Sequence, residues 1–484
     1  MTVGRRSMVT TTYILLSRLI VLAANVLVVL LVTRYLGREG FGHYAFVMAY
    51  SLIVGTLATG GTFAILIRDT ARDRTQAGEN LGSALQVQLT YTVVATALGA
   101  LLLPLFTNDP LVRNATLLSI LAVDIQVLAN LYMWVFTAFE DTFYMTLSVI
   151  LERGLFVAGV LLVIYFNWGF IALFGVQLCS FVVKLVFCAT IVYLRFARPV
   201  WRFDGERFRY FWRESLPLLF SNGFRTLDSQ LDAMLIQLLG TAAQLGLYGA
   251  PYRILSSVNI VPDSIMAGLL PAFSRLVRER SDKALILYGK IFKYFLAGSA
   301  PVAVIVSFLS RPLMTLLFGP EFSEGATTLR FMVWAVVFMF PNYLFQYVLT
   351  ALGRQEYEMI RLAISLLPHA GLGLLLIPRL GAAGAALGML VAQIISFAVG
   401  FFYVTRILGI YRPWGVALKL AIGALPAVAL FYFWPSGPLL AQLVIAGVTY
   451  FALLILLRVF RKDELLVLVQ AFRQGGKSPV SIEG

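Results

Sequence analysis

The chain has 484 residues, of which 60% are hydrophobic and only 13% are charged, and its formal net charge is +14. A water-soluble globular protein of this length would be far more polar, so the composition predicts an all-α polytopic membrane protein. The basic residues lie in short loops beside apolar segments, as anionic lipid headgroups favour, so the net charge does not indicate nucleic-acid binding.

Fourteen apolar segments follow one another along the chain, and each reaches the roughly 20 residues that a helix needs to cross the hydrocarbon core. In chain order they cover residues 12–35, 41–67, 82–104, 115–138, 145–166, 170–194, 215–239, 246–272, 291–312, 326–351, 359–378, 382–404, 415–434 and 438–458. Gly60 and Gly61 interrupt the second segment, and several later segments contain proline. Membrane helices tolerate such breaks where the freed backbone faces protein or water.

Basic residues are distributed unequally between alternate loops. If the N-terminus lies in the cytoplasm, the inner loops hold dense basic blocks such as those at 195–213 and 275–293. The outer positions then hold only Arg34, Arg38, Arg113, Arg311, Arg330 and Arg379. The positive-inside rule therefore predicts 14 transmembrane helices with both termini in the cytoplasm, joined by short loops.

Short echoes indicate an internal duplication. The stretch Leu36–Tyr44 is echoed by Leu239–Tyr248, Thr137–Phe139 by Thr350–Leu352, and the pair Ser180-Phe181 by Ser396-Phe397. A repeat of six helices keeps the same orientation in both copies, which predicts two pseudo-symmetric six-helix lobes with a site between them. We assign residues 1–200 to the N-terminal lobe, 201–405 to the C-terminal lobe, and 406–484 to helices 13 and 14 and a cytoplasmic tail.

Ionisable residues inside the predicted segments are the first indication of a functional site. They are Arg18, Asp124, Glu152, Arg153, Lys184, Arg225, Asp228, Asp232, Arg253 and Asp263. A charge at the bilayer centre costs about 2.5–3.5 kcal/mol, so such groups face a partner or a water-filled cavity. Because acids and bases balance, two interpretations stay open. In the first, the ten residues form ion pairs between helices. In the second, the basic residues bind an anionic substrate and the acidic residues bind a coupling ion.

The segment 216–239 carries Arg225, Asp228 and Asp232 at i, i+3 and i+7, which places them on one face of a helix. Arg225 is nearer the cytoplasmic entrance, whereas the two acids lie deeper, level with Arg253 on the next helix, so an ion pair is expected there.

The repeat places Arg18 opposite this helix, and Lys184 lies at middle depth. The predicted substrate-binding cations are Arg18, Arg225, Arg253 and Lys184. The predicted ion-coupling or ion-pairing acids are Asp228, Asp232, Asp124 and Asp263. Glu152 and Arg153 rank lower, because adjacent residues point about 100° apart on a helix.

Motifs that would indicate an enzyme are absent. The sequence contains no Walker A loop, no HExxH, no Cys/His cluster and no dinucleotide-binding loop. We therefore expect no catalytic activity, no metal and no cofactor apart from a coupling Na⁺ or H⁺.

The stretch from Tyr35 to Thr62, YLGREGFGHYAFVMAYSLIVGTLATGGT, and the following IRDTARD at 67–73 resemble the start of Wzx-type polysaccharide-biosynthesis flippases. The matching features are the Leu-Gly pair, the Phe-Gly-x-Tyr and the Arg-x-x-Ala. The resemblance continues through Leu239-Gly240, Pro271 and Leu317-Phe318-Gly319. These flippases belong to the superfamily of multidrug, oligosaccharidyl-lipid and polysaccharide exporters.

The resemblance implies alternating access and transfer of a polyprenyl-pyrophosphate-linked oligosaccharide to the outer leaflet of the plasma membrane, driven by an ion gradient. The related lipid II flippase branch implies substrate-binding roles for Arg18 and Arg253. Expected partners are this substrate, membrane lipids, a polysaccharide polymerase and other assembly proteins; a monomer is expected. The alternatives are a lipid II-type flippase, an ion-coupled multidrug antiporter, and a membrane glycosyltransferase or polymerase, which would need a catalytic acidic loop or a large outer loop.

Overall fold

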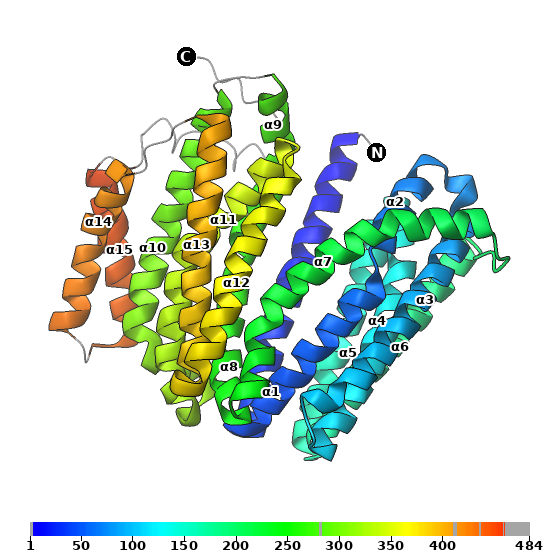
Figure 1. Cartoon of the computed structure of the whole chain (residues 1–484), viewed down its shortest axis with the longest axis horizontal. Helices are drawn as coiled ribbons and strands as arrows, with labels where there is room; N and C mark the ends of the chain where they lie inside the picture. The colour runs from blue at the N-terminus through cyan, green and yellow to red at the C-terminus, as the bar shows by residue number, and fades with distance from the viewer. Residues whose placement is uncertain (1–2, 280–282, 410–413, 435–436, 458, 460–484) are drawn as a thin grey trace. The chain divides into compact units, whose positions relative to one another are not determined.

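The structure is a computed structural model that describes residues 3–279, 283–409, 414–434, 437–457 and 459 (Figure 1). Throughout these residues the regular secondary structure is helical, which confirms the predicted all-α class. The backbone of residues 3–20 is described, but their side chains are not. Most of the predicted C-terminal tail also lies outside the described residues.

The first long element, α1 (Val3–Thr59), consists of two helices joined at Gly37. Gly37 has φ 67° and ψ −173°, a conformation that only glycine adopts without strain. The break falls between the predicted segments 12–35 and 41–67. A second break follows at Gly60 and Gly61, both with positive φ, after which α2 (Thr62–Arg72) begins.

Two compact units make up the chain, and each is described by itself. Unit 1 comprises Met1–Arg253, Leu317–Phe322 and Gly373–Ala385. Beyond α1 and α2 its helices are α3 (Ala77–Leu102), α4 (Pro110–Ala138), α5 (Thr142–Tyr165), α6 (Phe170–Arg195), α7 (Gly205–Leu239) and most of α8 (Ala242–Val258).

A buried apolar cluster joins five helices at one end of unit 1. It includes Leu66 of α2, Leu81 of α3, Phe136 of α4, Val192 of α6 and Phe211 of α7. Each of these side chains is at most 2% exposed, so the first turns of α7 are packed firmly onto α2 and α3.

A close crossing joins α1 to α8 within the same unit. A Cβ atom added at Gly42 would lie 1.8 Å from the carbonyl oxygen of Ala242, and one added at Gly246 would lie 2.1 Å from that of Arg38. Only glycine permits this approach of two helix backbones.

Unit 2 comprises Ile254–Leu316, Ser323–Leu372 and Ala386–Gly484. Its helices lie within α9 (Ile260–Arg278), α10 (Lys283–Phe318), α11 (Ala326–Ala351), α12 (Gln355–Leu380), α13 (Ala382–Leu408), α14 (Trp414–Phe433) and α15 (Leu439–Leu456). Tyr450 of α15 is fully buried and its hydroxyl donates to the carbonyl oxygen of Ala297 in α10 at 3.1 Å, which ties the last helix to the unit.

Within the described residues, nine helical stretches are long and apolar enough to cross a membrane. One of them, Ala23–Thr59, contains the break at Gly37, and two shorter apolar helices cover Leu418–Phe433 and Ala441–Leu456. The protein is therefore a multi-pass membrane protein. The number of crossings, their orientation and the lobe boundaries at 200 and 405 stay predictions.

Candidate functional site

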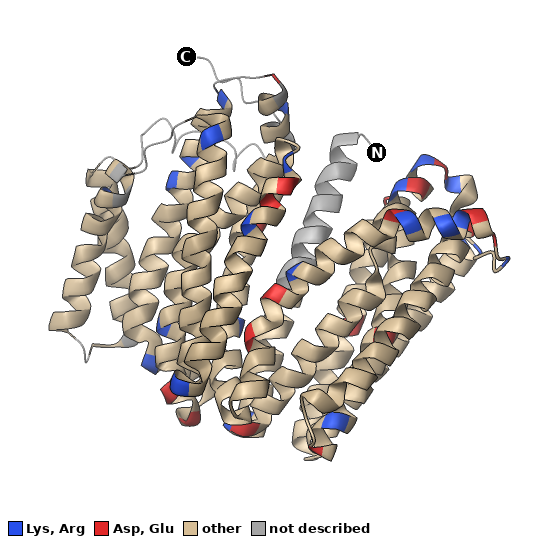
Figure 2. Ribbon diagram, in the orientation of Figure 1, with Lys and Arg blue, Asp and Glu red and all other residues tan. Residues whose placement is uncertain are grey.

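Charged residues are sparse along the middle of the helices and gather near their ends (Figure 2). The face of α7 that carries Arg225, Asp228 and Asp232 is the main exception. Burial increases along this face, because Arg225 is exposed, Asp228 is half-buried and Asp232 is only 4% exposed. Arg225 makes no hydrogen bond or ion pair with the described part of the chain.

Contacts with α1 and α8 fix the orientation of α7. The hydroxyls of Thr226 and Thr56 lie 3.2 Å apart, which holds α7 against α1. Farther along α7, Asp232 accepts a hydrogen bond from the hydroxyl of Tyr248 of α8 at 2.5 Å. Asp228 also interacts electrostatically with Tyr248. The predicted ion pair between these acids and Arg253 stays a prediction.

Arg253 shares an electrostatic partner, Tyr44, with Arg153, which the sequence ranks lower. Arg253 is half-buried on α8, and both it and Arg153 of α5 interact electrostatically with the hydroxyl of Tyr44 on α1. Arg153 also donates to Asn25 Oδ1 of α1 at 3.3 Å. Two guanidinium groups from distant parts of the sequence therefore both act on the charge of one tyrosine. The only signal in the sequence was the depth of Arg153 in its apolar segment.

Lys184 forms a buried ion pair. Its Nζ lies 2.5 Å from Glu152 Oε2 and donates to Asn130 Oδ1 at 2.9 Å. The side chains of Lys184 and Glu152 are only 4% and 3% exposed, and Arg153 Nε lies 3.3 Å from the other carboxylate oxygen. The charge of Lys184 is therefore neutralised by Glu152 in this structure. Its role in binding the substrate stays a prediction.

Two further predicted acids have hydroxyl partners. Asp124 of α4 is 8% exposed and accepts a hydrogen bond from Thr96 of α3 at 2.7 Å. Asp263 of α9, in unit 2, accepts one from Tyr347 of α11 at 2.9 Å. Neither acid forms an ion pair with the described residues. A carboxylate can take up a proton, and together with a hydroxyl it offers the oxygen atoms that a small hard cation prefers.

The predicted site residues are thus only partly brought together. Unit 1 places Arg225, Asp228, Asp232 and Arg253 on the adjacent helices α7 and α8, whereas Lys184 belongs to a separate pair. Arg18 lies in α1, but its side chain is outside the described residues.

A second polar cluster lies where α2 meets the start of α7, outside the apolar spans. Arg68 Nε lies 2.9 Å from Asp69 Oδ1, and Arg68 Nη1 lies 3.2 Å from Glu214. Arg68 Nη2 donates to the hydroxyl of Tyr210 at 2.6 Å, and that hydroxyl donates to Asp69 Oδ2 at 3.0 Å. The hydrogen bond with Asp69 raises the pKa of Arg68 above its ordinary value. Burial, together with Asp69, raises the pKa of Tyr210.

Residues 8–277 match the protein family described as "Polysaccharide biosynthesis protein", and residues 217–375 match the family described as "MatE". The chain is 26% identical over 198 residues to an uncharacterized membrane protein of Methanocaldococcus jannaschii. It is 22% identical over 195 residues to the capsular polysaccharide biosynthesis protein CapF of Staphylococcus aureus. Each alignment covers 40% of this chain, and they cover 39% and 49% of the two relatives respectively.

The fold is similar to two solved transporter structures. An inward closed conformation of the lipid II flippase MurJ gives a TM-score of 0.75 at 15% identity, covering 93% of this chain and 99% of that chain. An inward-facing multidrug resistance MATE family transporter of the MOP superfamily gives 0.69 at 17% identity, covering 80% and 94%. At these identities the similarity establishes the fold alone.

Proposed function

Since the chain belongs to the family of polysaccharide biosynthesis proteins, we propose that it is a flippase for a lipid-linked oligosaccharide. It is a membrane transporter of the MOP superfamily and not an enzyme. The proposed cargo is an oligosaccharide on a polyprenyl-pyrophosphate carrier, moved from the cytoplasmic to the outer leaflet of the plasma membrane by alternating access. The likeness to CapF supports a role in making a cell-surface polysaccharide.

The proposal rests on the exposure of Arg225 and on its lack of a partner among the described residues. Arg225 is an exposed guanidinium on a mixed polar and apolar part of α7, and it has no partner in the described part of the chain. Arginine binds phosphate oxygens through two parallel hydrogen bonds, which suits a pyrophosphate better than a single point charge does. Arg253 of α8 and Arg153 of α5, which both act electrostatically on Tyr44 of α1, supply further positive charge within unit 1.

We further propose 14 crossings with both termini in the cytoplasm, arranged as two six-helix lobes and two extra C-terminal helices. The positions of the helices and the breaks at Gly37 and Gly60-Gly61 support this count. In this topology Arg225 lies nearer the cytoplasmic side, where the substrate arrives. We also propose that the protein is a monomer and that its partners include a polysaccharide polymerase and other assembly proteins.

The acids are the proposed link to an ion gradient. Asp232 is buried beside the Tyr248 hydroxyl, and Asp228 is close by on the same face of α7. These oxygens suit Na⁺ or a proton, whose binding would alter the charge next to the substrate cations.

The second candidate function is ion-coupled drug export, which the match of residues 217–375 to the MatE family favours. Organic cations would be bound by a cavity with net negative charge, and Arg225, which has no ion-pair partner among the described residues, opposes that. A lipid II-type flippase, which the fold of MurJ suggests, would use the same cations on a different glycan.

The test is transport of a fluorescent polyprenyl-pyrophosphate oligosaccharide by the purified protein in vesicles. Replacing Arg225 by Ala should lower the rate by about tenfold or more, because a charged hydrogen-bonding partner of the pyrophosphate is lost. Arg225→Lys should be intermediate, since lysine lacks the forked geometry. The matched control is Arg113→Ala, which removes an exposed arginine of α4. Unchanged transport in Arg18→Ala, Arg225→Ala and Arg253→Ala would refute the assignment.

A further inference from the structure

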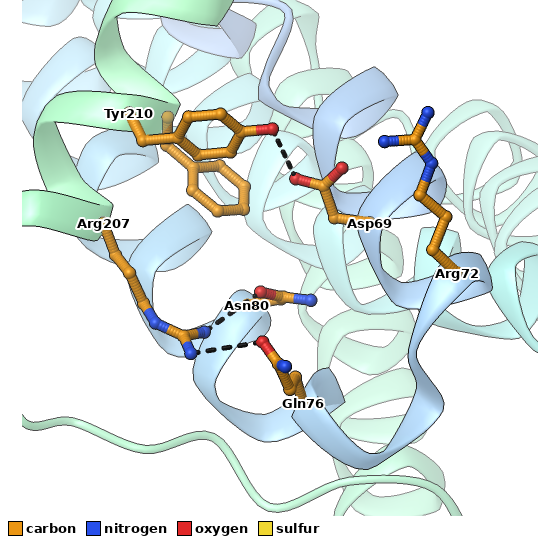
Figure 3. Close-up of a pocket in the computed structure, with 7 residues that line it drawn as sticks. Asp69, Arg72, Gln76, Asn80, Arg207 and Tyr210 are labelled. Carbon is orange, nitrogen blue, oxygen red and sulfur yellow. Dashed lines mark hydrogen bonds between the residues drawn. The ribbon is translucent and has the colours of Figure 1, made fainter.

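A small polar pocket opens at the end of unit 1 where α2 ends and α3 and α7 begin (Figure 3). Its volume is about 250 Å³. The lining residues are Asp69, Arg72, Gln76, Asn80, Arg207, Tyr210 and Phe211. The pocket lies outside the apolar spans and is separate from the charged face of α7 that contains Arg225.

Packing below the pocket makes it a preformed site. Phe211 belongs to the buried cluster that joins α7 to α2 and α3. Arg207 of α7 reaches across to α3, where its guanidinium donates to Asn80 Oδ1 at 3.3 Å and to Gln76 Oε1 at 3.2 Å. Arg207 also forms an ion pair with Glu79. The two walls are therefore tied together without any ligand.

Several hydrogen-bonding groups of the lining remain unused. Asn80 is only 6% exposed, yet its amide nitrogen donates to no group in the described part of the chain. Arg72 likewise has no partner among those residues. Asp69 uses one lone pair on each carboxylate oxygen, for Arg68 and Tyr210, whereas a carboxylate can accept about four hydrogen bonds. Figure 3 shows these donors and acceptors around one opening, below the ring of Tyr210.

Ion pairs neutralise most of the charge around the pocket and leave Arg72 as its cationic donor. Arg207 is already neutralised by Glu79 and Asp204. Arg68 beside the pocket is neutralised by Asp69 and Glu214. The remaining lone pairs of Asp69 can only accept hydrogen bonds, so they suit a ligand with hydroxyl donors, which a fully ionised phosphate lacks.

Sugar hydroxyls match this lining because each hydroxyl donates one hydrogen bond and accepts others. The ring of Tyr210, which is 42% exposed, offers an apolar face for the C–H side of a sugar ring. Small-molecule sites combine convergent polar groups with aromatic surface, and Tyr210 and Phe211 supply the aromatic part of this mostly polar pocket.

We propose that this pocket binds one neutral sugar unit of the transported glycan before the glycan enters the protein. Asp69, Asn80 and Arg72 bind its hydroxyls, and Tyr210 lies against its ring. This inference rests on the proposed function, since it takes the cargo to be an oligosaccharide and this end of unit 1 to be cytoplasmic. It deepens that function by assigning a sugar subsite remote from the pyrophosphate cations.

Binding is measured first, with the full-length protein in detergent and a panel of methyl glycosides as probes. Saturation-transfer NMR should detect at least one neutral glycoside, and inorganic phosphate should not compete with it. Arg72→Ala and Asp69→Asn should each weaken binding by about tenfold, because each removes a charged hydrogen-bonding partner. The control Arg113→Ala should leave binding unchanged. Binding of phosphate but of no glycoside would overturn the proposal, as would undiminished binding by both variants.

Transport then separates this proposal from the proposed function. Arg72→Ala should raise the KM for the fluorescent lipid-linked oligosaccharide while leaving kcat and the melting temperature close to those of the unaltered protein. If the unaltered protein transports no lipid-linked oligosaccharide, the proposed function fails. If it transports this substrate and the variant has an unchanged KM, only the sugar subsite is refuted.

Discussion

Separating Lys184 from Glu152 should destabilise the protein more than any surface charge substitution. The Lys184 Nζ lies 2.5 Å from the carboxylate, and both side chains are at least 96% buried within unit 1. Removing one partner of a buried ion pair costs about 3–5 kcal/mol, because the remaining charge is left without compensation. Glu152→Gln should fall within this range, since Lys184 then has only neutral acceptors such as Asn130.

The two single substitutions should not be equivalent. In Lys184→Met the carboxylate of Glu152 keeps Arg153, whose Nε is 3.3 Å away and whose side chain is 26% exposed. We therefore expect a cost of about 3 kcal/mol for Lys184→Met. The double substitution should cost less than Glu152→Gln alone, because it leaves no unpaired lysine.

Thermal unfolding in detergent, followed by intrinsic fluorescence, measures these differences. The single variants should melt about 3–5 °C lower than the unaltered protein, since the unfolding entropy of a chain of 484 residues is large. The control is Glu214→Gln, which breaks an exposed pair with Arg68 and should cost no more than about 1 kcal/mol. The reasoning is refuted if both single variants have the melting temperature of the unaltered protein. It is also refuted if the decrease in the double variant equals the sum of the decreases in the two single variants.

Three further predictions concern packing, pH and ion coupling. Gly42→Ala should cost about 1–3 kcal/mol in thermal unfolding, because the new Cβ would lie 1.8 Å from a carbonyl oxygen of α8, whereas Gly175→Ala, with nothing within 4 Å, should be harmless. The raised pKa of Tyr210 means that its contribution to stability is complete below pH about 10 and is lost as pH rises through the higher folded value, so Tyr210→Phe should flatten the melting curve against pH there. Asn in place of both Asp228 and Asp232 should abolish the dependence of transport on a Na⁺ or H⁺ gradient, and a retained dependence would contradict their coupling role.

The sequence determined the class of the protein and the course of its helices. Hydropathy and length are local properties of a segment, because lipid stabilises any sufficiently long apolar helix wherever its neighbours lie. The expected breaks near Gly37 and at Gly60-Gly61 could be predicted for the same reason, since a positive φ depends on a single residue. The charges inside apolar segments were likewise visible from sequence alone.

Only the tertiary structure decided which partner each charge has. Arg153 and Glu152 are neighbours in sequence, yet one reaches Asn25 of α1 and the other pairs with Lys184 of α6. That choice depends on how each helix is rotated and which helix packs beside it, and neither follows from a single segment. The pocket lined by Asp69, Asn80 and Arg207 required the same information, because α7 is distant in the chain from α2 and α3, which supply the other wall. Arg225 could be singled out from sequence, but that it has no partner in the described chain emerged only from the packing of α7.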